Sequence, residues 1–110
     1  MTFVPKYENL LKDTEVRRWH ENVNAGSIIT GEVYLRTLGL YCRLQNTTPE
    51  DIVRDAEEGK LRNDFMDFVR RLEKEGKAGS YIVRFKKVLS SWTRYNEISL
   101  DLKSVKIKEA

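Results

Sequence analysis

The sequence has little of what several common protein classes need. Cys42 is its only cysteine and His20 its only histidine among 110 residues. A single cysteine cannot form an internal disulfide, and one cysteine with one histidine cannot supply a zinc cluster or a Cys–His nucleophile pair. We therefore expect a chain without catalytic residues, metal or cofactor, located in a reducing cytoplasm.

Long hydrophobic runs are also missing. No stretch approaches the roughly 18 apolar residues that a membrane-spanning helix requires. The first six residues lack the basic-then-apolar layout of a signal peptide, so no membrane partner is expected. What is present, 40% hydrophobic and 34% charged residues, is the composition of an ordinary globular domain with one core.

Glycine and proline divide the chain into segments with helical periodicity. Helices are expected at residues 14–23, from Ser27 or Thr30 to 44, and at 49–58, 63–75 and 80–96, with a further short turn near 7–11. Asp13 and Thr48 are the expected N-caps, and Gly59 and Gly76 the expected stops. Beyond residue 97, apolar and polar residues alternate up to Ile107, which predicts an extended tail or short strand without a core to bury it.

These elements predict an all-α fold, a compact orthogonal bundle of four to five helices with an extended C-terminal tail. Residues 1–97 would form the domain and residues 98–110 a linker. In the second long helix, the helical wheel predicts a buried arc of Val33, Tyr34, Leu38, Tyr41 and Leu44. The core of the bundle is expected to contain Trp19, Tyr34, Leu38, Phe65, Phe68, Leu72, Phe85, Val88 and Trp92.

Charge is unevenly distributed along the chain. The net charge is only +3. Residues 77–110 carry eight basic and three acidic side chains, a net charge of +5, which leaves −2 for the first 76 residues. The helix at 49–58 is strongly acidic and is expected to face away from a polyanion or to meet a basic partner domain. This asymmetry favours an anionic partner for the C-terminal third.

The expected helix at 80–96 carries basic residues and no acidic residue. Lys87 and Arg94 are seven residues apart and therefore lie on one face, which Ser80, Arg84 and Ser91 share. Such a surface suits phosphate oxygens and base edges, and Lys77 just before the helix can reach a phosphate. The alternative is a solvated face whose cationic end is favoured by the helix dipole.

A weaker basic face is expected on the helix that ends at Leu44. Arg36 and Arg43 are also seven residues apart and lie opposite the predicted apolar arc, with Gly39 between them as a smooth surface for a close backbone approach. Thr30 is either the cap of this helix or a phosphate donor.

Two runs of residues resemble the N-terminal core-binding domain, often called SAM-like, of tyrosine recombinases, the phage-type integrases. The first run contains Trp19, Gly26-Ser27-Ile28-Ile29-Thr30, Tyr34-Leu35-Arg36-Thr37-Leu38 and Tyr41. The second contains Phe65, Phe68-Val69-Arg70-Arg71-Leu72, Gly76-Lys77, Ser80-Tyr81-Ile82 and Val88-Leu89-Ser90-Ser91-Trp92. The likeness spans about residues 7–107, and the Val16-Arg17-Arg18-Trp19 lead-in is similar to archaeal members.

The resemblance implies one half of a C-shaped clamp on double-stranded DNA. The other half would be a C-terminal catalytic domain of the same protein, which cuts and rejoins the strand, and the partners would include other recombinase protomers in a synaptic assembly. Two helices would insert at the major groove. By matching position, Thr30 and Arg36 carry over from the first helix, and Lys77 and Ser80 from the second.

Two other functions remain open at this point. One is a helical protein–protein interaction module, which would show a contiguous exposed apolar patch. The other is a repressor-like helix-turn-helix protein that uses residues 63–75 and 80–96 as its helix pair. The extended tail favours the recombinase domain over the repressor.

Overall fold

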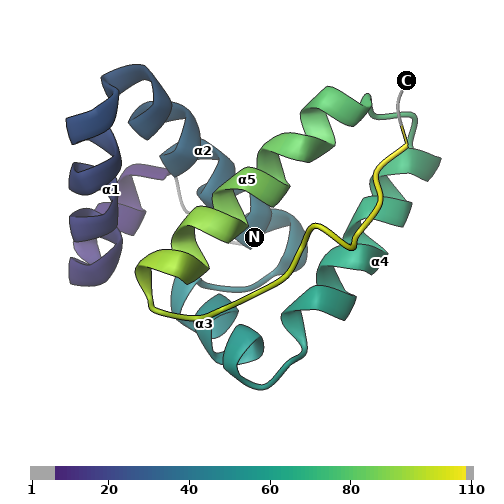
Figure 1. Ribbon diagram of the computed structural model, residues 1–110. Coiled ribbons are helices and arrows are strands. Elements are labelled where there is room, and N and C mark those ends of the chain that lie inside the picture. Colours follow the sequence, from purple (N-terminus) through teal and green to yellow (C-terminus); the bar gives the residue numbers. More distant parts are fainter. Residues whose placement is uncertain (1–6, 109–110) are drawn as a thin grey trace, which may run out of the picture. The chain divides into compact units, whose positions relative to one another are not determined.

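The computed structural model describes residues 7–108, and these contain helices, turns and loops but no strand (Figure 1). The expected all-α class is therefore confirmed. The elements are a short 3-10 helix, η1, followed by five α-helices: η1 (Tyr7–Lys12), α1 (Thr14–Gly26), α2 (Ile28–Gln45), α3 (Pro49–Glu57), α4 (Leu61–Lys74) and α5 (Gly79–Tyr95).

The chain divides into two compact units, Met1–Pro49 and Glu50–Ala110. Unit 1 contains η1, α1 and α2. Unit 2 contains α3 from its second residue, α4, α5 and a C-terminal segment, residues 96–108. The predicted DNA-binding residues are therefore divided between the two units.

In unit 1, a single residue separates α1 from α2. Asp13 caps α1, because its side chain accepts hydrogen bonds from the backbone N–H groups of Glu15 and Val16. Ser27 then adopts an extended conformation (φ −165°), ends α1 and caps α2 by accepting from the backbone N–H of Thr30 at 3.2 Å. The expected cap at Asp13 is confirmed, whereas the cap of α2 is Ser27 and not Thr30.

The buried face of α2 differs from the predicted arc. Leu38 and Tyr41 are buried as expected, but Val33 and Leu44 are exposed, and the buried residues of the helix are Gly31, Leu35, Thr37, Leu38, Gly39, Tyr41 and Cys42. The central stripe, Gly31, Leu35, Leu38 and Cys42, lies about a quarter turn from the predicted arc at 100° per residue. Helix α1 is in contact with α2, and at Gly31 the missing side chain leaves room for Asn24 of α1. Gly39 is also buried. The prediction that it provides a smooth exposed surface is therefore wrong.

Unit 2 is held together by aromatic residues of α4 and α5. Phe65, Phe68 and Phe85 are each at most 1% exposed, and the rings of Phe68 and Phe85 meet edge to face at 5.0 Å. Leu72, Val88 and Trp92 are also buried, as predicted from the two helical stripes. Burial of these rings stabilises the packing of α5 within unit 2.

The C-terminal segment is not the uncovered tail that the sequence predicts. Its described residues form neither helix nor strand, but Leu102 and Val105 are only 2% and 1% exposed. Lys86 Nζ donates to the carbonyl oxygen of Val105 at 3.2 Å, and Arg62 Nε donates to Ser104 Oγ at 3.0 Å. The apolar side chains thus pack into unit 2, because removing them from water lowers the free energy of the folded chain.

Candidate nucleic-acid interface

One face of α5 presents the predicted set of polar and basic residues as a continuous row. We define the α5 stripe as Ser80, Arg84, Lys87, Ser91 and Arg94. At 100° per residue these five positions fall within an arc of about 80°, and from first to last they span about 21 Å of helix. Ser91 is half-buried and the other four are exposed. The structure therefore brings the predicted α5 residues together on one open face.

The cations of the α5 stripe are not neutralised within the described part of the chain. Arg84, Lys87 and Arg94 make no ion pair with any described residue, in contrast to Arg54 with Asp51 or Lys60 with Glu58. Lys86 points elsewhere and bonds to the C-terminal segment. Basic side chains without an acidic neighbour bind the phosphates of a nucleic acid favourably, because the nucleic acid releases its condensed counterions on association.

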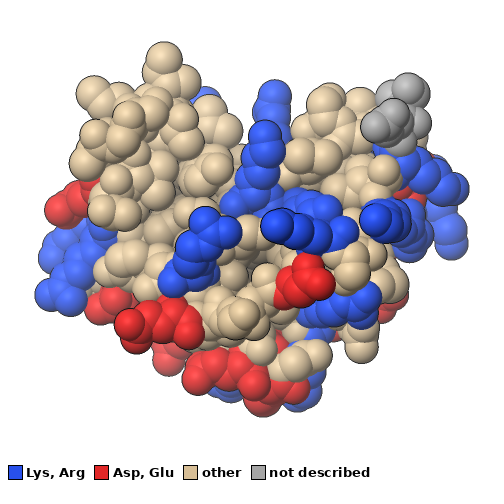
Figure 2. All heavy atoms as spheres, in the orientation of Figure 1, with Lys and Arg blue, Asp and Glu red and all other residues tan. Residues whose placement is uncertain are grey.

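In unit 2, basic and acidic side chains lie on different elements. Helix α5 has no acidic residue, whereas α3 and the residue after it expose Glu50, Glu57 and Glu58. Figure 2 shows Lys and Arg side chains gathered over α5 and the C-terminal segment, and Asp and Glu side chains over α3. Burial raises the pKa of Asp55 in α3, and the nearby carboxylate of Asp64 raises it further. A polyanion is thus repelled by one side of unit 2 and attracted by another.

The remaining predicted residues lie outside the α5 stripe. Lys77 lies in the turn before α5, exposed, with its Nζ 5.8 Å from the ring centre of Tyr81. Thr30, Arg36 and Arg43 belong to α2 in unit 1, where Arg36 and Arg43 are exposed and Thr30 is half-buried in the first turn. The structure thus divides the predicted residues between the two units. Three lie along α2 in unit 1, and six belong to unit 2, namely the five residues of the α5 stripe and Lys77 before the helix.

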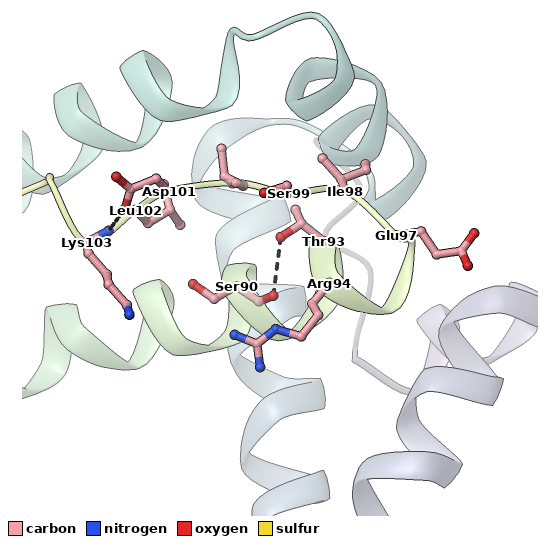
Figure 3. A pocket seen from close by; sticks show the side chains of 10 residues that line it. Ser90, Thr93, Arg94, Glu97, Ile98, Ser99, Asp101, Leu102 and Lys103 are labelled. Carbon is pink, nitrogen blue, oxygen red and sulfur yellow. Dashed lines mark hydrogen bonds between the residues drawn. The ribbon is translucent and has the colours of Figure 1, made fainter.

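A pocket of about 570 Å³ opens beside the C-terminal end of the α5 stripe. It is lined by Ser90, Thr93 and Arg94 of α5 and by residues 97–103 (Figure 3). Its volume lies within the range of about 300–1,000 Å³ that is usual for ligand sites. Neither Ser90 nor Lys103 was among the predicted site residues, and Lys103 lies in the segment that was expected to be a linker. The sequence places Lys103 in the basic C-terminal third, which is the one feature that connects it with the predicted anionic partner.

Comparisons with protein-family models, with curated proteins and with solved structures found no match for this chain. Among the residues that the structure describes, no helix has both the length and the apolar character needed to cross a membrane. Within the same residues, no three His, Cys, Asp or Glu side chains gather where they could hold a metal ion.

Proposed function

We propose that this chain binds double-stranded DNA through the α5 stripe. The observation that carries the proposal is an acid-free helix face on which Arg84, Lys87 and Arg94 are exposed and have no ion-pair partner among the described residues. Solvent-exposed helices usually mix acids and bases four residues apart, because opposite charges stabilise the helix. An α-helix fits the major groove, where such cations contact phosphates and Arg can bond to guanine.

The finer proposal is the DNA-binding domain of a site-specific tyrosine recombinase. Its support is the sequence resemblance over about residues 7–107. In this proposal Thr30, Arg36 and Arg43 on α2 contact the same duplex as the α5 stripe, and strand cleavage belongs to a separate catalytic domain. This chain alone should then bind supercoiled plasmid without nicking it, which an agarose gel measures after prolonged incubation. Nicking that persists through repurification would contradict this part of the proposal.

Charge reversal tests the DNA-binding proposal directly. We expect Lys87→Glu and Arg94→Glu each to weaken binding of a fluorescein-labelled 25-base-pair duplex about tenfold at low salt, measured by fluorescence anisotropy. Lys60→Glu is the matched control, because it changes the net charge equally and lies in unit 2 beside acidic Glu58. It should cost less than about twofold. Unchanged binding by both stripe variants, or an equal loss from Lys60→Glu, would exclude the α5 stripe as the interface.

A second candidate function, a protein–protein interaction module, is favoured by one observation in unit 1. Ile28 and Ile29, in the first turn of α2, are 72% and 78% exposed, and Val33 one turn later is 36% exposed. Neighbouring exposed isoleucines are typical of a surface that another protein covers. Sedimentation velocity across a hundredfold concentration range tests self-association, which the double variant Ile28→Ser/Ile29→Ser should abolish. A wild-type chain that stays monomeric throughout would exclude a homotypic module.

A further inference from the structure

We propose that the pocket at the C-terminal end of α5 is a phosphate subsite that holds one backbone phosphate of the bound DNA strand. The proposal rests on the proposed DNA-binding function and extends it to residues outside the α5 stripe. The subsite is formed by Arg94 and Ser90 of α5 together with Lys103 of the C-terminal segment. Residues 97–103 would then be part of the nucleic-acid interface and not only a linker.

The backbone fixes the C-terminal wall of this pocket. Glu97 has a left-handed conformation (φ 61°), and the N–H groups of Glu97 and Ile98 donate to the carbonyl oxygens of Arg94 and Thr93. This termination turns the chain back beside α5, where Leu102 is buried. The backbone N–H of Lys103 donates to Asp101 Oδ1 at 2.9 Å, which closes a turn directly before the Lys103 side chain. Lys103 is therefore carried on an anchored segment.

The charges of the pocket are arranged for an anion. Figure 3 shows the Arg94 guanidinium and the Lys103 ammonium reaching toward the side where Ser90 presents its hydroxyl, while the carboxylates of Glu97 and Asp101 point away from it. Neither Arg94 nor Lys103 forms an ion pair with a residue that the structure describes. A guanidinium, an ammonium and a hydroxyl are donors that together suit the oxygens of a phosphate.

Continuity with the α5 stripe identifies the source of that phosphate. Arg94 is both the last residue of the stripe and a residue of the pocket lining. A DNA strand whose phosphates follow Arg84 and Lys87 therefore reaches the pocket at its next contact. The volume of about 570 Å³ exceeds what a bare phosphate needs and admits the attached sugar.

The test compares Lys103→Ala with Lys106→Ala in duplex binding. Both lysines are exposed in the same segment, but Lys106 does not line the pocket. We expect Lys103→Ala to weaken binding about three- to tenfold and Lys106→Ala less than twofold. Thermal unfolding of both variants should match that of the unmodified chain, because neither side chain is buried. Equal losses from the two variants would mean a diffuse charge effect and would overturn the subsite.

A scan of the duplex with single neutral methylphosphonates locates the phosphate. We expect one position at which the substitution weakens binding by the unmodified chain clearly more than binding by Lys103→Ala, because the variant has already lost one of the contacts to that phosphate. No such position would overturn the subsite. If Lys87→Glu weakens binding while Lys103→Ala does not, the subsite fails and the proposed function stands. If Lys87→Glu and Arg94→Glu have no effect, the proposed function itself fails.

Free nucleotide is the other source of a phosphate, and a separate titration distinguishes it. ADP is added to the chain at constant ionic strength, with and without the duplex, and binding is followed through the amide resonances of Ser90 and Lys103. We expect only weak, millimolar shifts that the duplex removes. Micromolar ADP binding that the duplex leaves intact would overturn the proposal in favour of a small-molecule site.

Discussion

At Gly31, helix α2 lies close to Asn24 of α1. A Cβ at this position would overlap the Asn24 side chain, and it would lie 3.2 Å from the Asn24 Cα. Asn24 Oδ1 is itself buried without a hydrogen-bond partner among the described residues, as is His20 Nε2 one turn earlier. His20 Nε2 lies 3.6 Å from a Glu32 carboxylate oxygen. The helix pair is thus close-packed around polar atoms.

Gly31→Ala should destabilise the chain. The added methyl group displaces Asn24 and shifts the α1 backbone, at a cost that exceeds the gain in helix propensity, so we expect a loss of about 1 kcal/mol in urea unfolding. Gly26→Ala is the control, because a Cβ there meets nothing within 4 Å, and it should be neutral or slightly stabilising. The double variant Asn24→Ala/Gly31→Ala should recover most of the loss. If Gly31→Ala is as stable as Gly26→Ala, this close approach does not constrain the fold.

Glu97 occupies a backbone conformation that glycine adopts more easily. Its φ of 61° lies in the left-handed region, where a Cβ is unfavourable by about 1–2 kcal/mol, while glycine loses about 1 kcal/mol more backbone entropy on folding. Glu97→Gly should therefore raise the free energy of unfolding by roughly 0.5 kcal/mol, seen as a higher urea midpoint at unchanged slope. Glu97→Ala keeps the strain and serves as the control. A gain from alanine equal to that from glycine would assign the effect to charge instead.

At the scale of elements, four helices end in the same way. In each, two backbone N–H groups just past the helix donate back to its last-turn carbonyls, around a residue with positive φ: Asn46, Gly59, Gly76 and Glu97. These are Schellman terminations. Glycine and asparagine tolerate this geometry, and the stops predicted at Gly59 and Gly76 are therefore confirmed. The termination of α5 places Glu97 in this geometry instead, although the expected end of the helix at residue 96 lies within one residue of Tyr95, where α5 ends.

The C-terminal segment is fastened to α4 through a carboxylate. Glu73 Oε2 accepts from the backbone N–H of Lys108 at 2.7 Å, and Arg70 bonds both to Glu73 and, at 2.6 Å, to the carbonyl oxygen of Lys106. The hydrogen bond from Lys108 and then the bond and charge of Arg70 hold the pKa of Glu73 below its ordinary value of 4.5. The ionised carboxylate is therefore the form that fastens the segment.

This pKa shift predicts a release of the segment in acid. A carboxyl with a lowered folded-state pKa contributes stability above pH 4.5, and that contribution disappears as the pH falls through the lower folded-state value. Hydrogen exchange of the Lys108 amide should accelerate over that window, beyond the intrinsic pH dependence of exchange. Glu73→Gln should show fast exchange already at neutral pH, with Asp67→Gln as a surface control on the same helix. Equal protection in Glu73→Gln would show that the carboxylate does not hold the segment.

At the scale of the whole molecule, the salt dependence of DNA binding counts the phosphates that are contacted. In the proposed interface, unit 2 supplies Lys77, Arg84, Lys87, Arg94 and Lys103, and unit 1 supplies Arg36 and Arg43. Each phosphate neutralised contributes about −0.9 to the slope of log affinity against log salt, so seven contacts predict about −6.

The double variant Arg36→Ala/Arg43→Ala separates the contributions of the two units. If both units hold one duplex, we expect the slope of the double variant to be less steep, about −4.5, which is the value for five contacts. Anisotropy titrations between 50 and 200 mM NaCl measure both slopes. An unchanged slope in the double variant would limit the interface to unit 2 and contradict the two-helix clamp.

The local features of this protein follow from its sequence alone. Period-3.6 stripes of apolar residues predict α4 and α5 with their buried rings, Asp13 predicts the start of α1, and the spacing of Ser80 to Arg94 predicts a basic stripe. These features depend on interactions within one or two helical turns, which the residue order determines directly. Whether the α5 stripe contacts DNA, and whether a recombinase is its source, stay predictions.

Only the tertiary structure decided which face of α2 is buried, and where the C-terminal segment lies. Helix α2 is apolar on more than one side, so its wheel does not identify the side on which α1 packs, and contact at Gly31 settles it. The alternating apolar and polar residues of the segment suit either a strand or an irregular segment that packs against helices. Leu102 and Val105 are buried because unit 2 offers them a surface, and this contact, between residues far apart in the chain, also creates the pocket beside Arg94.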